Sequence, residues 1–216
     1  MENRRNFLKK TLKSFVGLGL LFSPFVNGVQ LVYGKAKKII LPKGTDRKTL
    51  IDKNPRSLDT RNLEITPLKD FETMGVTDYD VNFDDWRLKV SGRIEAPIKL
   101  AYSQILALPP IERDVLLICP GFFANHGKWK GFSIGKLLKK AKVAKGVTHV
   151  SFSGPAGKYE ESFPIEDIYS NKVFLAYGVN GEILPEKHGF PLRVVAESYY
   201  GSDWVKFVSH VNVGEA

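Results

Sequence analysis

The stretch Asp114-Val115-Leu116-Leu117-Ile118-Cys119-Pro120-Gly121 joins four consecutive aliphatic side chains to a cysteine and a turn signal. An aliphatic run this short is typical of a buried β-strand, and a Pro-Gly pair ends such a strand. The pattern therefore predicts a strand that places Cys119, the only cysteine of the chain, at its end.

The segments on both sides of this strand predict an α+β domain. Residues 86–92 alternate apolar and polar side chains and indicate a half-buried strand. Residues 122–131 are expected to form a loop, and residues 133–141 have the apolar spacing of an amphipathic helix. We expect a short helix at 100–108, a helical turn at 164–169, and further strands at 147–152, 160–164, 173–179, 192–196 and 204–213. Because strands outnumber helices, the expected fold is a mixed, barrel-like sheet with flanking helices.

The positive charge of the chain is concentrated near its N-terminus. The formal net charge is +9, yet residues 62–216 contain 18 Lys and Arg against 19 Asp and Glu. The domain itself is thus near neutral, and we do not expect it to bind nucleic acid. Residues 35–61 are basic and interrupted by Pro and Gly, which indicates a linker or an arm lying over the domain.

Residues 1–34 are similar to a twin-arginine export signal. Arg4-Arg5-Asn6-Phe7-Leu8-Lys9 precedes an apolar run from Ser14 to Val32 that is broken by Gly and Pro. A basic amphipathic anchor or a plain signal anchor is the alternative. The expected location is periplasmic or otherwise exported, with the twin-arginine machinery as a partner and with a tether if the segment is retained. Proteins that use this route travel folded, commonly because a cofactor is inserted first.

A lone cysteine leaves four roles open for Cys119: a nucleophile with a histidine base, a zinc or copper ligand beside histidines, an inert buried thiol, or a soft ligand to a redox metal held by a cofactor. The histidines at 126, 149, 188 and 210 show no metal-ligand spacing. The fourth role needs separate evidence of a cofactor pocket.

That evidence is an ordered series of short motifs. They are Trp86 to Gly92, Cys119 followed by Trp129-Lys130-Gly131, Asn180 to Pro185, His188-Gly189-Phe190-Pro191-Leu192-Arg193, and Tyr200 to Lys206. Over residues 62–213 this series resembles the molybdopterin-binding domain of the sulfite oxidase family. The resemblance implies a mixed α+β barrel-like fold, an oxidoreductase, and a molybdenum–molybdopterin cofactor with one pterin. It also assigns residues 62–216 to that domain.

The resemblance also assigns roles to individual residues. Cys119 becomes the molybdenum ligand and catalytic residue, and the expected cofactor-binding residues are Phe71, Thr73, Cys119, Ser153, His188, Arg193, Trp204, Val205 and Lys206. A guanidinium suits phosphate or pterin oxygens, which agrees with the role given to Arg193. Some of Phe122, Phe123, His126 and Trp129 are expected to line a substrate funnel.

Two departures from sulfite oxidases guide the expected function. Thr73 falls where those enzymes have an arginine beside the metal, and no arginine lies between Leu63 and Trp86. Because the chain ends at Ala216, we also expect no dimerisation domain and a monomer. Sulfite oxidation is therefore not expected, since its anionic substrate needs fixed positive charge.

The layout is more similar to the catalytic subunit of the periplasmic methionine sulfoxide reductase system. That resemblance implies a small-molecule or protein-sulfoxide substrate and an electron-transfer partner, either a cytochrome or a membrane haem protein. A non-catalytic binding module that has kept the fold, and a cysteine hydrolase, are the other classes that the sequence leaves open.

Overall fold

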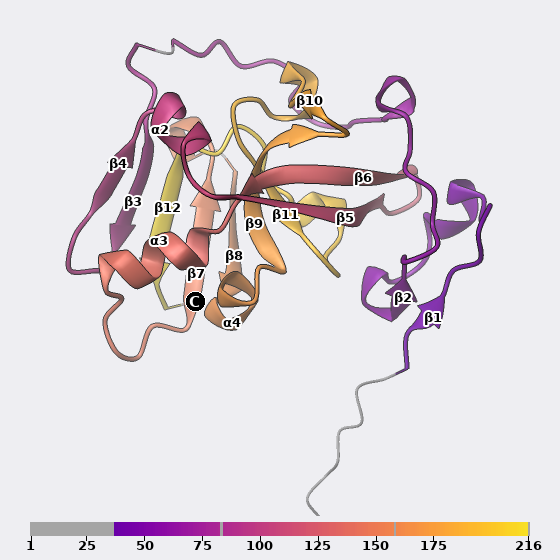
Figure 1. Cartoon of the computed structure of the whole chain (residues 1–216), viewed down its shortest axis with the longest axis horizontal. Coiled ribbons are helices and arrows are strands. Elements are labelled where there is room, and N and C mark those ends of the chain that lie inside the picture. The colour runs from indigo at the N-terminus through magenta and orange to yellow at the C-terminus, as the bar shows by residue number, and fades with distance from the viewer. Residues whose placement is uncertain (1–36, 83, 158, 216) are drawn as a thin grey trace, which may run out of the picture. The chain divides into compact units, whose positions relative to one another are not determined.

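The computed structural model describes residues 37–82, 84–157 and 159–215, and one compact unit begins at Lys38 (Figure 1). Its strands are β1 (Ile39–Ile40), β2 (Leu58–Asp59), β3 (Leu88–Gly92), β4 (Ile98–Leu100), β5 (Pro110–Cys119), β6 (Phe123–Phe132), β7 (His149–Ser153), β8 (Glu160–Pro164), β9 (Val173–Val179), β10 (Glu182–Ile183), β11 (Arg193–Ala196) and β12 (His210–Gly214). Its α-helices are α2 (Tyr102–Leu106), α3 (Ile134–Ala141) and α4 (Ile165–Tyr169). Short 3-10 turns are η1 (Arg47–Leu50), η2 (Pro55–Ser57), η3 (Leu68–Asp70), η4 (Pro155–Gly157), η5 (Glu186–His188) and η6 (Gly201–Asp203).

Two five-stranded sheets enclose a shared core. One sheet has the order β10-β9-β6-β5 with β11 also paired to β9, and all its pairs are antiparallel. The other has the order β4-β3-β12-β7-β8, in which β12 and β3 are parallel. Side chains of both sheets meet in one apolar cluster. The predicted α+β fold with a mixed, curled sheet and few helices is confirmed.

Helix α3 follows directly from its sequence. Ser133 caps its N-terminus by accepting a hydrogen bond from the Lys136 amide, and Ile134, Leu137 and Leu138 are buried on one face. The expected helix at 133–141 is thus confirmed. Among the described residues, no helix is long and apolar enough to cross a membrane.

The expectation of a loop at residues 122–131 is wrong, because this segment forms β6 and pairs with β5 along its whole length. Glycines at 127 and 131 made it look like a loop. Both are sites of close packing: a Cβ at Gly131 would lie 1.9 Å from the Leu175 carbonyl oxygen. Glycine in a strand often marks such an approach, which a single sequence does not reveal.

The expected strand at 204–213 begins only at His210. Residues 204–209 are irregular, and Phe207 has a φ of 56°. Trp204, Val205 and Lys206 therefore belong to a connecting segment rather than to a sheet.

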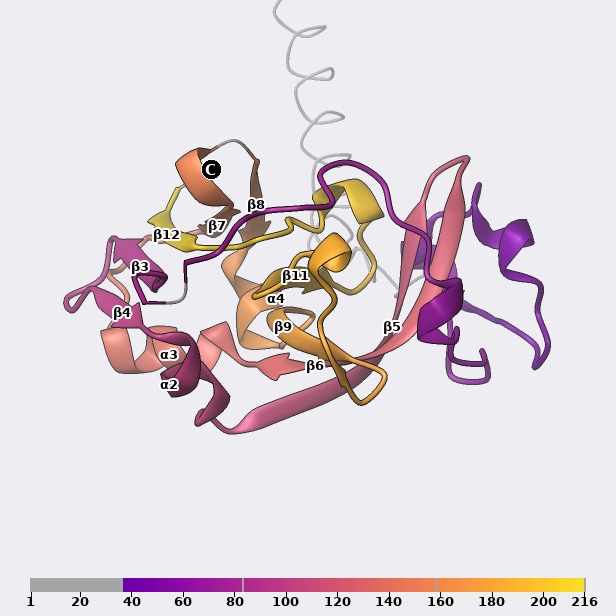
Figure 2. The ribbon, with the colours of Figure 1, turned by 90° about the horizontal axis from the view of Figure 1, so that it is seen from above.

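Residues 38–63, named here the N-terminal arm, contain the parallel pair of β1 and β2. Figures 1 and 2 both show the hairpin of β5 and β6 extending toward this arm. Buried leucines of the arm form a second, smaller apolar cluster with side chains of β5 and β6.

Candidate cofactor site

A cavity of about 790 Å³ opens where the end of the β5–β6 hairpin meets the loop of residues 71–79, η5, the start of β11 and residues 201–207. This volume is within the range typical of small-molecule and cofactor sites. Segments from distant parts of the chain thus enclose one space.

Eight of the nine side chains expected to bind a cofactor line this cavity: Phe71, Thr73, Cys119, His188, Arg193, Trp204, Val205 and Lys206. Ser153 is not among the lining residues, although the next two residues, Gly154 and Pro155, are. Of the four residues considered for a substrate funnel, Phe123 and Trp129 line the cavity, and Phe122 and His126 do not.

Cys119 reaches the cavity because β5 alternates its faces. Leu117 and Cys119 line the cavity, while Leu116 and Ile118 pack in the smaller cluster beneath the N-terminal arm. Partial burial raises the pKa of the thiol. No described residue forms a hydrogen bond with its sulfur. A thiol that acts as a nucleophile needs a lowered pKa, whereas the pKa of Cys119 is raised. A bound metal ion would deprotonate the thiol outright.

Arg193 is a buried cation without a carboxylate partner among the described residues. Its guanidinium lies over the rings of Trp129 and Trp204, at 5.1 and 5.5 Å from their centroids. Nη1 donates to the His188 carbonyl oxygen at 3.1 Å, and burial lowers the pKa of Arg193 to about 9. Since an uncompensated buried charge is costly, this arrangement favours an anionic ligand.

His188 presents an unsatisfied ring nitrogen. The residue is 1% exposed, its ring meets Phe71 edge to face, and Nε2 is buried without a hydrogen-bond partner among the described residues. Burial, together with Arg193 and two lysines, lowers the pKa of His188 to about 4, so the ring is neutral at pH 7. The indole nitrogen of Trp204 is likewise buried and unpaired within the described chain. Orphaned polar atoms in residues that line a cavity point to a ligand.

Lys206 connects the loop at residues 73–76 to η5. Its Nζ donates to Thr73 Oγ1 at 2.7 Å and approaches the carbonyl oxygens of Met74, Val76 and Lys187 at 2.9, 3.0 and 3.0 Å. Burial and the neighbouring Arg193 lower the pKa of Lys206 to about 8. The backbone at Gly189 has a φ of 106°, and a Cβ there would lie 2.9 Å from Lys206 Cβ. Glycine after His188 therefore allows Lys206 to approach.

The model of the oxidoreductase molybdopterin binding domain family matches residues 74–216. The chain belongs to this family. The predicted family, oxidoreductase class and molybdenum–molybdopterin cofactor are therefore confirmed.

Named relatives and a solved structure agree with this assignment. An NADH nitrate reductase of Lotus japonicus is 30% identical over 165 residues, which are 62% of this chain and 18% of that protein. The protein-methionine-sulfoxide reductase catalytic subunit MsrP of Gluconobacter oxydans (strain 621H) is 28% identical over 145 residues, covering 59% and 46%. The crystal structure of the sulfane dehydrogenase SoxCD from Paracoccus pantotrophus matches the fold with a TM-score of 0.59 at 24% identity, covering 64% and 40%. The match thus extends over less than half of each of these proteins.

The residues present fit the molybdopterin cofactor. Arg193 and Lys206 supply positive charge for a phosphate, and His188 and Trp204 supply unpaired nitrogens for polar ring atoms. Cys119 supplies a soft sulfur on the same cavity. Among the described residues, no group of three or more His, Cys, Asp and Glu side chains could hold a metal ion. A metal at Cys119 would accordingly take its other ligands from the cofactor.

Asn125 was not anticipated from the sequence. Its side-chain amide donates to the Glu72 carbonyl oxygen at 2.8 Å and accepts from the Glu72 amide at 3.3 Å, so it holds the loop that carries Phe71 and Thr73. Only the unexpected strand pairing of β6 places Asn125 on the cavity side. No local signal in the sequence marks this role.

Proposed function

We propose that this chain is an exported molybdenum–pterin oxidoreductase in which Cys119 ligates the metal. The observation that carries the proposal is that a lone thiol, the buried Arg193 and the half-buried Lys206 line the same cavity, and that neither cation has a carboxylate partner among the described residues. When bound, the cofactor supplies a metal that changes oxidation state during oxygen-atom or electron transfer with a small polar substrate.

The chain's own residues hold and orient the cofactor. Arg193 and Lys206 bind its phosphate, and the aromatic rings of Trp129 and Trp204 keep the guanidinium in place. Neutral His188 offers Nε2 to a polar atom of the pterin without adding a third charge. Phe71, Phe123 and Trp204 cover apolar parts of the cavity and exclude water from it.

A reductase of oxidised sulfur groups, such as methionine sulfoxide, is the more specific candidate. The loop at residues 71–79 contributes two carboxylates, Glu72 and Asp78, and no cation to the cavity lining. Such a wall suits a neutral sulfoxide better than nitrate or sulfite, because carboxylates repel anions. The similarity to MsrP supports the same choice.

The export signal expected at residues 1–34 lies outside the described residues. We propose a periplasmic location, reached through the twin-arginine machinery, and a cytochrome or membrane haem protein as the electron partner. The similarity to MsrP supports the idea of a separate electron partner.

The direct test is metal and pterin analysis of protein matured with its N-terminal segment intact. We expect about one molybdenum and one pterin per chain, because a single cavity contains all the proposed contacts. Reproducible absence of molybdenum under molybdate-replete growth would contradict the proposal.

Substrate choice is tested on the same preparation with an artificial electron donor. We expect turnover of methionine sulfoxide, free or in peptides, to exceed turnover of nitrate at equal concentrations by about tenfold or more, because the acidic loop opposes anions. Nitrate as the better substrate would overturn the sulfoxide assignment while leaving the cofactor assignment intact.

The charge of Lys206 predicts a pH-dependent affinity for the cofactor. Because the pKa of Lys206 is about 8 in the free site, its ammonium is present below pH 8 and lost above it. As the pH rises from 7 to 9, an anion bound to the ammonium should dissociate more readily. Above the pKa, the affinity for the anion should fall by up to about tenfold per pH unit. Pterin release from the parent protein, measured by fluorescence after dialysis, should increase with pH in this way.

The variant Lys206→Met should release pterin faster at pH 7 and show a flat profile from pH 7 to 9. The control Lys187→Met changes an exposed lysine whose side chain does not line the cavity, and should keep the parental slope. An unchanged slope in Lys206→Met would show that another group titrates.

A further inference from the structure

The N-terminal arm covers the face of the β5–β6 hairpin that points away from the cofactor cavity. A small apolar cluster joins the two, formed by Leu41, Leu50, Leu58 and Leu63 of the arm with Leu116, Ile118 and Ala124 of the hairpin. An isolated two-stranded hairpin is marginally stable in water. The arm therefore supplies the apolar cover that the outer face of this hairpin needs.

The arm also holds the turn that follows Cys119. The Gly121 amide donates to the carbonyl oxygen of Ile51 at 3.2 Å, and the Phe122 amide donates to that of Cys119 at 3.0 Å. The backbone of this turn is thus hydrogen-bonded to the arm at Gly121, two residues after Cys119.

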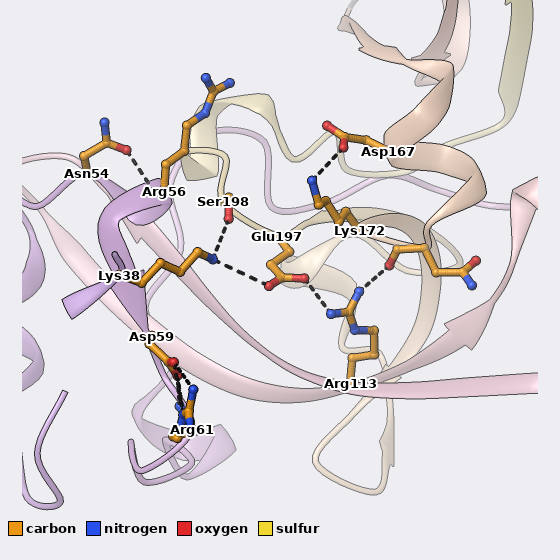
Figure 3. A network of polar contacts seen from close by, with 11 residues as sticks. Lys38, Asn54, Arg56, Asp59, Arg61, Arg113, Asp167, Lys172, Glu197 and Ser198 are labelled. Carbon is orange, nitrogen blue, oxygen red and sulfur yellow. Dashed lines mark hydrogen bonds and ion pairs between the residues drawn. The ribbon is translucent and has the colours of Figure 1, made fainter. Parts of the chain in front are cut away.

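A second set of contacts links the arm to residues 197–200, which lead into the cavity wall at Gly201 to Lys206. Figure 3 shows the contacts of Lys38 with Glu197 and Ser198. Lys38 Nζ donates to Ser198 Oγ at 3.4 Å and forms an ion pair with Glu197 at 4.0 Å. Arg113 of β5 binds the same carboxylate at 2.5 Å. The guanidinium of Arg56 lies 5.3 Å from the ring centroid of Tyr199.

The arm contacts two walls of the cavity, the β5–β6 hairpin and the segment that leads to Gly201. These two walls are packed tightly against each other. A Cβ on Gly201 would lie 2.9 Å from Leu117 Cδ2 and 3.2 Å from the Ile118 carbonyl oxygen. Tyr200 packs against the apolar cluster beneath the arm. A displacement of the hairpin would therefore displace the wall that carries Trp204 and Lys206.

We propose that the N-terminal arm is a brace that positions Cys119 against residues 201–206, although none of its residues lines the cavity. The arm lies outside the matched family region, which begins at residue 74. That Cys119 needs to be held in position rests on the proposed function. The packing of the arm against the hairpin is independent of that function.

The test is amide hydrogen exchange on the purified full-length chain, comparing Leu50→Ala with the parent. Leu50 is 2% exposed and belongs to the small cluster. We expect amides of residues 116–124 to exchange about tenfold faster or more, because the cover of the hairpin is lost, and those of β3 and β12 to change less than about twofold. If Leu50→Ala does not fold, Leu50→Val provides the same comparison with a smaller loss of volume.

The matched control is Leu88→Ala, which removes an equally large buried side chain from β3 in the other sheet. It should accelerate exchange in β3 and β12 more than at residues 116–124. A third variant, Arg56→Gln, should accelerate exchange of residues 197–204 by a few-fold, because the contact with Tyr199 is lost.

Parental exchange at residues 116–124 in Leu50→Ala, or equal acceleration in both sheets, would overturn the brace. The exchange readout needs no molybdenum. A failure of the brace is therefore distinguishable from a failure of the Cys119 ligand assignment, which metal analysis reveals.

Discussion

Cys119→Ser should lower turnover by at least about a hundredfold while the protein keeps its pterin. Even residues that only orient metal ligands cost about 10- to 100-fold when changed, and loss of a direct ligand should cost more. The pterin should stay, because Arg193, Lys206 and His188 do not depend on the thiol. Serine offers a hard oxygen in place of a soft sulfur, so it does not restore the ligand.

Three measurements on the same preparation check this expectation: the steady-state rate, pterin content by fluorescence, and the number of sulfur ligands per molybdenum by X-ray absorption. The number of sulfur ligands per molybdenum should fall by one. The control Ile183→Ser introduces the same residue at a 72% exposed position on β10 and should match the parent in all three. A fully active Cys119→Ser protein would refute the ligand assignment.

The same variant addresses the cysteine hydrolase that the sequence left open. A hydrolase would lose activity in Cys119→Ser without any change at a metal, and its thiol would be reactive at neutral pH. Burial raises the pKa of this thiol instead, so the metal-free protein should react slowly with alkylating agents at pH 7.

Arg193→Met should have opposite effects on cofactor binding and on the stability of the cofactor-free protein. With cofactor present, we expect pterin content to fall about tenfold or more, since a charge-assisted, forked contact to an anion is lost. Without cofactor, the guanidinium is a buried charge with no carboxylate partner among the described residues. Replacement of such a charge by an apolar side chain of similar length should leave the protein equally stable or stabilise it by about 1–4 kcal/mol.

Thermal unfolding of protein made in a strain unable to synthesise the pterin checks the second effect. A gain of 1 kcal/mol corresponds to a rise in Tm of about 2–4 °C for a chain of this size. The control Arg93→Met removes a half-exposed arginine paired with Glu215 and should leave pterin content unchanged. Parental pterin content in Arg193→Met, or a strongly destabilised cofactor-free protein, would show that Arg193 is a structural residue.

Local pattern in the sequence was sufficient to locate several elements of the site. The apolar run before Cys119 predicted a strand that ends at the thiol, and the structure has β5 ending there. The spacing of Ile134, Leu137 and Leu138 predicted α3. These features depend on neighbours in the chain, whose periodicity a single sequence shows directly.

The tertiary structure alone decided how the site is closed and charged. Gly127 and Gly131 gave β6 the appearance of a loop, because their close packing depends on distant residues such as Leu175. That Trp129 packs on the guanidinium of Arg193, and that Lys206 reaches Thr73, depends on residues more than 60 positions apart in the chain. A sequence shows which residues can carry charge or sulfur, whereas packing determines which of these groups are left without a partner and face the same cavity.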